Sequence, residues 1–156
     1  MISSIDRAFI EMAIAKASEN IFDGGGPFGA VIVRDGEVLA TACNRVVAEA
    51  DPTAHAEVMA IRLAAQKLAT HDLSGCTLYT SCEPCPMCLG AIYCAGIGRV
   101  VYAATRHDAA AAGFSDEHIY NEIALEIGNR SIEFINAAGD KGKEVFREWI
   151  GFPGKT

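Results

Sequence analysis

Three residues with metal-binding side chains lie in two short segments of the sequence. His55 stands in residues 53–57 (TAHAE), and Cys85 and Cys88 stand in residues 83–88 (EPCPMC). Side chains three positions apart share one face of a helix, and a helix start stabilises thiolates through its dipole and its unpaired N–H groups. Three protein ligands leave a tetrahedral zinc ion one open position, which is typical of a catalytic site and not of a structural one.

Glu57 supplies the group that would make such a zinc site catalytic. It lies two residues after His55, and the site does not need it as a ligand. Zinc lowers the pKa of a bound water to about 7, and a nearby carboxylate can then move the proton of that water. An H-x-E segment followed by P-C-x-x-C is the signature of zinc deaminases. We therefore expect hydrolytic deamination, with one zinc ion per chain and Glu57 as the proton-transferring residue.

Other interpretations of these residues stay open at this point. Cys82, Cys85 and Cys88 also have the spacing of an iron–sulfur cluster, although the position expected for its fourth cysteine is occupied by Ile92. Histidine and free cysteine are often plain core residues, but a buried Glu57 would then need a polar partner. A zinc-binding scaffold protein without catalysis would need the three ligands and not the glutamate.

The composition favours one compact domain that acts on a small molecule. The chain has 156 residues, of which 51% are hydrophobic, and its 13 basic and 20 acidic residues give a net charge of −7. The basic residues form no stripe, which argues against a nucleic-acid partner. No apolar run approaches the length of a membrane span, and residues 1–20 have the pattern of an amphipathic helix and not of a signal peptide. We expect a cytoplasmic protein with reduced cysteines.

The elements that must position the site follow from hydrophobic periodicity and turn residues. Helices are predicted at 3–22, 53–69 (with Asp51 as N-cap), 85–95, 117–126 and 143–150, and strands at 30–33, 38–42, 77–81, 99–103 and 131–136. This alternation predicts an α/β fold, a three-layer α/β/α sandwich with a five-stranded mixed sheet. Residues 1–156 are expected to form a single zinc-dependent deaminase domain, in which 137–156 provide a C-terminal helix and tail that can cover the active site.

Three blocks of the sequence resemble a known family. Residues 25–33, 51–57 and 81–92 are similar to the cytidine-deaminase-like superfamily, and the chain looks most like its bacterial guanine deaminases from about residue 5 to about residue 125. The zinc motifs identify only the superfamily. The resemblance to the guanine deaminases rests on the amino-acid sequence of residues 81–88 and of the segment 109–120.

The resemblance implies roles for further residues. Asn44 would bind the base through its amide, Phe28 would cover the ring, and Asp116 would recognise purine N–H groups and help to move protons. Ala54 and His55 would also lie against the substrate, and Thr80 with the backbone of 81–83 could approach the ring. Simpler readings are a turn residue at Asn44, a core residue at Phe28 and a helix cap at Asp116. Phe114 is expected mainly to pack.

The resemblance implies conversion of guanine and water to xanthine and ammonia by a homodimer, with C-terminal segments that can be exchanged between subunits. This chain lacks a terminal tyrosine, so Trp149 and Phe152 are the candidates for a residue that closes the pocket. The alternatives are a tRNA adenosine deaminase, disfavoured by the acidic charge balance, and a deaminase of cytosine or isocytosine, of a nucleoside or of a triazine such as ammeline.

Overall fold

The computed structural model describes residues 2–154, so the last two residues of the expected C-terminal tail lie outside the described part. The chain divides into two units, Met1–His118 and Ile119–Thr156, and each is described by itself. The single deaminase domain expected over 1–156 stays a prediction. No helix in the described range is both long and apolar enough for a membrane span.

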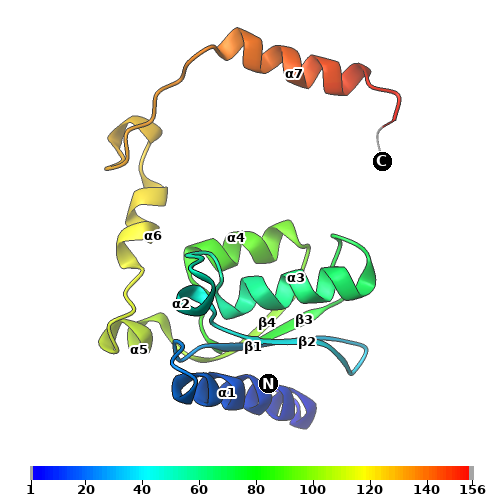
Figure 1. The fold of residues 1–156 in the computed structure, drawn as a ribbon, viewed down its shortest axis with the longest axis vertical. Helices are drawn as coiled ribbons and strands as arrows, with labels where there is room; N and C mark the ends of the chain where they lie inside the picture. The colour runs from blue at the N-terminus through cyan, green and yellow to red at the C-terminus, as the bar shows by residue number, and fades with distance from the viewer. Residues whose placement is uncertain (1, 155–156) are drawn as a thin grey trace. The chain divides into compact units, whose positions relative to one another are not determined.

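The first unit is built on a mixed sheet with the strand order β2-β1-β3-β4. Its strands are β1 (Gly29–Arg34), β2 (Glu37–Cys43), β3 (Thr77–Cys82) and β4 (Arg99–Ala104). Strand β1 runs antiparallel to β2 and β3, whereas β3 and β4 are parallel. Helix α1 (Ser4–Phe22) covers one face, and α3 (Ala56–Leu68) and α4 (Pro86–Cys94) cover the other (Figure 1). The predicted α/β/α layers and mixed sheet are confirmed.

Local sequence signals explain most of these boundaries. Asp35 and Gly36 both have positive φ, as the two-residue turn between β1 and β2 requires. Ser3 and Asp6 form a reciprocal capping box at the start of α1. The helix expected from residue 53 begins only at Ala56, because Asp51 accepts hydrogen bonds from the backbone and hydroxyl of Thr53 and closes a turn before the helix.

Two short helices were not predicted, α2 (Val46–Glu49) and α5 (Arg106–Ala111). The second has a sequence signal that could have found it, since Thr105 and Asp108 form another capping box. Helix α2 has no side-chain cap, and it ends at Ala50 in a left-handed conformation.

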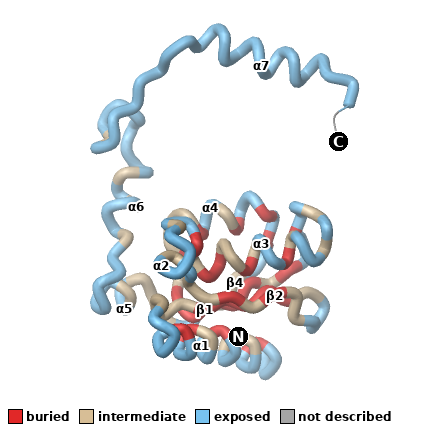
Figure 2. The backbone as a smooth tube through the Cα atoms, in the orientation of Figure 1, coloured by how far each residue is buried: buried red, intermediate tan, exposed pale blue. Residues whose placement is uncertain are grey.

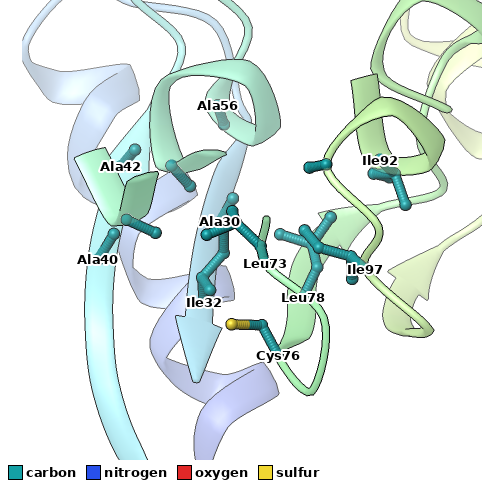
Figure 3. Close-up of a cluster of buried hydrophobic side chains, with 13 residues drawn as sticks. Ala30, Ile32, Ala40, Ala42, Ala56, Leu73, Cys76, Leu78, Ile92 and Ile97 are labelled. Atoms are coloured by element: carbon teal, nitrogen blue, oxygen red, sulfur yellow. The ribbon is translucent and has the colours of Figure 1, made fainter. Parts of the chain in front are cut away.

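The hydrophobic core lies on both sides of the sheet. The larger cluster, shown in Figure 3, joins the sheet to α3 and α4 and includes Ile32, Leu73 and Leu78, all fully buried. A smaller cluster around Val31 and Tyr79 joins the other face of the sheet to α1. Successive strand residues point to opposite faces, so Leu78 and Tyr79 serve different clusters. Figure 2 shows the buried residues gathered in these strands and in the helix sides that face them.

An ion pair between the buried Asp6 and the exposed Arg99 ties α1 to the sheet. Asp6 accepts hydrogen bonds from Arg99 at 2.7 and 3.0 Å and from the Tyr79 hydroxyl at 2.8 Å. The hydrogen bonds from Arg99, with those from Ser3 and Tyr79, hold the pKa of Asp6 far below its usual range. This carboxylate therefore connects the first turn of α1 to β3 and β4.

The fifth strand is a wrong prediction. Residues 131–136 have the expected β-branched and aromatic residues but form no strand, so the described sheet has four strands. A strand needs a hydrogen-bonded neighbour, and none of the four described strands pairs with this segment. The helices α6 (Glu117–Ala124) and α7 (Gly139–Gly151) confirm the last two helix predictions, α7 with an earlier start. None of residues 119–154 is buried.

Candidate active site

The three predicted zinc ligands meet where two helices begin. His55 is the N-cap of α3, Cys85 is the N-cap of α4, and Cys88 lies in the first turn of α4. The Cys85 and Cys88 sulfurs each lie 3.5 Å from His55 Nδ1, and the three ligand atoms are all within 4.8 Å of one another. Two sulfurs and one imidazole nitrogen at this spacing suit a tetrahedral zinc ion with one open position.

The protonation of the two thiols is unequal. The hydrogen bond with Cys88 lowers the pKa of Cys85 to about 4, with His55 as a further cause. The same pairing, together with burial, raises the pKa of Cys88. Its hydrogen bond with Cys85 raises the pKa of His55. Negative charge is therefore favoured on Cys85 over Cys88, and both thiols must be deprotonated to act as zinc ligands.

Glu57 lies directly beside this cluster, in the first turn of α3. Only 5% of the residue is exposed, and burial raises the pKa of its carboxyl. The Thr80 hydroxyl lies 3.2 Å from Oε1, and Cys88 donates to Oε2 at 3.5 Å. Among the described residues the metal-binding group consists of His55, Cys85 and Cys88, so the carboxyl of Glu57 borders the ligands without joining them.

A cavity of about 60 Å³ opens onto the cluster and brings together several of the predicted site residues. Glu57 and Asp116 both line it, as do His55 and Phe28. Phe114 lines it too and packs edge-to-face on Phe28, with ring centroids 5.0 Å apart. Two carboxyl groups that are 59 positions apart in the sequence therefore border the same small cavity, together with an aromatic pair.

Two of the predicted substrate residues do not line this cavity. The Asn44 side chain accepts a hydrogen bond from the Val46 backbone at 3.2 Å, as a turn residue does, and Asn44 lines a neighbouring hollow with Asn20. Ala54 is fully buried, and its carbonyl accepts from the Arg45 backbone at 2.8 Å. The substrate contacts implied for Asn44 and Ala54 stay predictions.

Hydrogen bonds from residues that were not predicted fix both ends of the loop that carries Phe28. The buried Asn20 donates to the carbonyls of Gly26 and Asn44 at 2.8 and 2.9 Å. At the other end of the loop, the backbone N–H of Gly29 donates to the Ser81 hydroxyl at 3.0 Å. A polar residue at the end of an amphipathic helix gives no sequence signal for such a role.

Glu83 and Arg106 are further cavity residues that the sequence did not single out. A Glu83 oxygen accepts from the Arg106 backbone at 2.9 Å, so the glutamate holds the start of α5 against the end of β3. Glu83 stands inside the zinc segment itself, which was the available signal. The capping box at Thr105 would have indicated the helix that carries Arg106.

The surroundings of Cys82 favour a zinc site over the iron–sulfur alternative. Its sulfur donates to the Thr105 carbonyl at 3.6 Å, and burial raises the pKa of the thiol to about 11. Cys82 is absent from the metal-binding group found among the described residues. It lines the cavity as a neutral thiol at the end of β3.

The remaining predicted positions are placed as follows. Thr80 is 1% exposed and contacts Glu57, and it does not itself line the cavity. Trp149 and Phe152 are exposed in the second unit, at 55% and 56%, and their role in closing a pocket stays a prediction.

Comparison with known proteins agrees with this site. Residues 3–104 match the cytidine and deoxycytidylate deaminase zinc-binding region. The sequence is 49% identical to the guanine deaminase of Bacillus subtilis (strain 168) over 94% of this chain and 95% of that protein. An X-ray structure of guanine deaminase from Bacillus subtilis matches with a TM-score of 0.94 and 47% identity, covering 99% of this chain and 98% of that chain.

Two further similarities frame the choice of substrate. A mutant of the protein NE0047, solved in complex with 8-azaguanine, is 39% identical with a TM-score of 0.69, over 71% of this chain and 64% of that chain. The tRNA-specific adenosine deaminase of Aquifex aeolicus (strain VF5) is 42% identical, over 62% of this chain and 64% of that protein. The chain therefore belongs to the zinc-binding cytidine and deoxycytidylate deaminase family, whose deaminases hydrolyse C–N bonds, and within it to the group of the bacterial guanine deaminases.

Proposed function

We propose that this protein hydrolyses guanine to xanthine and ammonia. The observation that carries the proposal is the cavity that Glu57, next to three zinc ligands, lines together with Asp116 and the Phe28–Phe114 pair. One carboxyl beside the metal suits proton transfer from water, and a second suits recognition of purine N–H groups. The similarity to guanine deaminase over nearly the whole chain supports the same substrate.

His55, Cys85 and Cys88 would hold one zinc ion per chain. When bound, the zinc ion acts as a Lewis acid and makes water nucleophilic at neutral pH. Glu57 takes a proton from the attacking water and delivers it to ring N3 while the C2–O bond forms. The bond between C2 and the exocyclic amino nitrogen then breaks, and the amino group leaves as ammonia with the second proton of the water. The burial of Glu57 keeps bulk water from competing for these protons.

The other site residues orient the base in this proposal. Asp116 accepts hydrogen bonds from purine N–H groups, and Phe28 covers the ring. Asn44 contributes its amide through its NH₂ group, since its oxygen already accepts from the Val46 backbone. Such positioning keeps C2 of the ring near the site of attack.

We propose a homodimer with exchanged C-terminal segments as the working form. None of residues 119–154 is buried, although this segment carries large apolar side chains. Phe146, Trp149 and Phe152, in and after α7, are each more than half exposed. A large exposed apolar face of this kind usually marks an interface. Strand β4 also pairs only with β3 and has a free edge in the described sheet. A second copy would supply cover for both surfaces. A monomeric mass by light scattering at micromolar concentration would contradict this.

A cytoplasmic location remains our proposal from the sequence. All six cysteines are free, as expected in a reducing compartment.

The deciding experiment measures ammonia release by the zinc-loaded protein from a panel of guanine, cytosine, isocytosine, ammeline, a nucleoside and tRNA carrying the target adenosine. We expect release from guanine above all others. Glu57→Gln should keep zinc, measured by metal analysis, and lose nearly all turnover. Preference for another ring or for tRNA would move the assignment to that alternative. Zinc binding with no release from any member would leave a zinc-binding scaffold protein.

A further inference from the structure

We propose that Thr80 is the positioning residue that orients the Glu57 carboxyl for proton transfer, an inference that rests on the proposed function. Thr80 lies on β3, and its side chain points toward α3, on the same face as Leu78. Its hydroxyl lies 3.2 Å from Glu57 Oε1 and 3.0 Å from the Cys82 carbonyl. At 1% exposure it is shielded from solvent and from the substrate cavity.

The second side-chain contact of Glu57 cannot serve this purpose once the site is loaded. Cys88 donates a proton to Oε2, but a zinc-bound cysteine is a thiolate and has no proton to donate. Thr80 is not a ligand, so its hydroxyl keeps its proton with or without the metal. The threonine is therefore the neighbour that can hold one carboxyl oxygen in place throughout the reaction.

A hydroxyl suits this position because it both donates and accepts. When Glu57 is a carboxylate, Thr80 donates to Oε1. When Glu57 carries the transferred proton on Oε1, the hydroxyl accepts from it and turns its own proton to the Cys82 carbonyl. Oε2 faces the zinc cluster in both cases. Valine has nearly the same shape but offers neither a donor nor an acceptor.

The test compares Thr80→Val, Thr80→Ser and Thr80→Ala with the control Thr77→Val, on the same strand but the opposite face. Thr80→Val should lower kcat for guanine about 10- to 100-fold, the loss expected for one hydrogen bond to a charged group. KM should stay within about threefold, because Thr80 does not touch the cavity. Thr80→Ser should recover most of the lost turnover, and Thr80→Ala should not. Thr77→Val should behave as wild type.

A second readout is independent of turnover. In the zinc-free protein, the shift in melting temperature caused by Thr80→Val should be about 2 °C or more larger than the shift it causes in a Glu57→Leu background. Equal shifts in the two backgrounds overturn the pairing, as does wild-type kcat in Thr80→Val or a failure of Thr80→Ser to exceed Thr80→Ala. If the wild-type protein released no ammonia from guanine, the proposed function would fail, while the melting cycle would still decide whether Thr80 and Glu57 interact.

Discussion

Replacing Gly29 with alanine should destabilise the protein by displacing α1 from the sheet. A Cβ atom at Gly29 would fall on the Ala13 carbonyl oxygen, 2.7 Å from the Ala17 backbone nitrogen and 2.9 Å from the Lys16 Cβ. Two of these three atoms belong to the backbone of α1, so no side-chain rotation relieves the overlap. Helix and strand would have to separate by about 0.7 Å or more to restore ordinary contact.

The expected cost lies at or above the upper end for an overpacked core, about 3 kcal/mol. Separation of α1 from β1 also weakens the packing of Ala13 and Ala17, which are 0% and 7% exposed. For a chain of this size about 3 kcal/mol corresponds to a fall in melting temperature of roughly 6–12 °C. Gly29 donates a backbone hydrogen bond to the Ser81 hydroxyl and directly follows Phe28, which lines the cavity. We therefore also expect a higher KM for guanine.

Circular dichroism melting of the zinc-loaded variants, with zinc content measured in parallel, checks this prediction. Gly90→Ala is the matched control, because Gly90 is an exposed residue of α4 with no atom within 4 Å of its added Cβ. There alanine should stabilise by up to about 1 kcal/mol through its better helix propensity. If Gly29→Ala melted within about 2 °C of wild type, the close approach of α1 to β1 would be refuted.

Three further perturbations have predictable outcomes. Asp6→Asn should lower the urea midpoint at pH 7, because the depressed pKa of Asp6 gives stability that is fully present above pH about 4. That stability is lost progressively as the pH falls from about 4 toward the folded-state pKa, so the gap to wild type should narrow by pH 3, and a gap that stays constant with pH contradicts this ion pair. Asn20→Asp should lower the free energy of unfolding by about 1–3 kcal/mol and raise KM for guanine, since it removes the donor to the Gly26 and Asn44 carbonyls. An unchanged melting temperature and KM would show that these hydrogen bonds do not hold the loop that carries Phe28. Cys88→Ser should reduce bound zinc and lower the melting temperature by several degrees, as removal of zinc with a chelator should do to the wild-type protein. The control Cys94→Ser changes an exposed cysteine and should do neither. Equal zinc content in both variants would argue against Cys88 as a ligand.

Local patterns were sufficient for most of the fold. The Asp35-Gly36 turn, the capped start of the first helix and the start of α4 near the zinc ligands depend on residues within a few positions of one another. The failure at residues 131–136 has the opposite cause. A strand needs a partner, and its own residues do not determine whether one is available.

The candidate zinc ligands and Glu57 could be selected from the sequence because their chemistry is encoded in short spacings. His55 and Glu57 are two residues apart, Cys85 and Cys88 three, and each pair lies at the start of a single helix, whose geometry sets the distance between them. The contact of Thr80 with Glu57 and the close approach of Gly29 to α1 came only from the tertiary structure. These contacts join positions far apart in the chain, and the register of β1 and β3 with the packing of helices on the sheet decides them. No spacing in the sequence records that register.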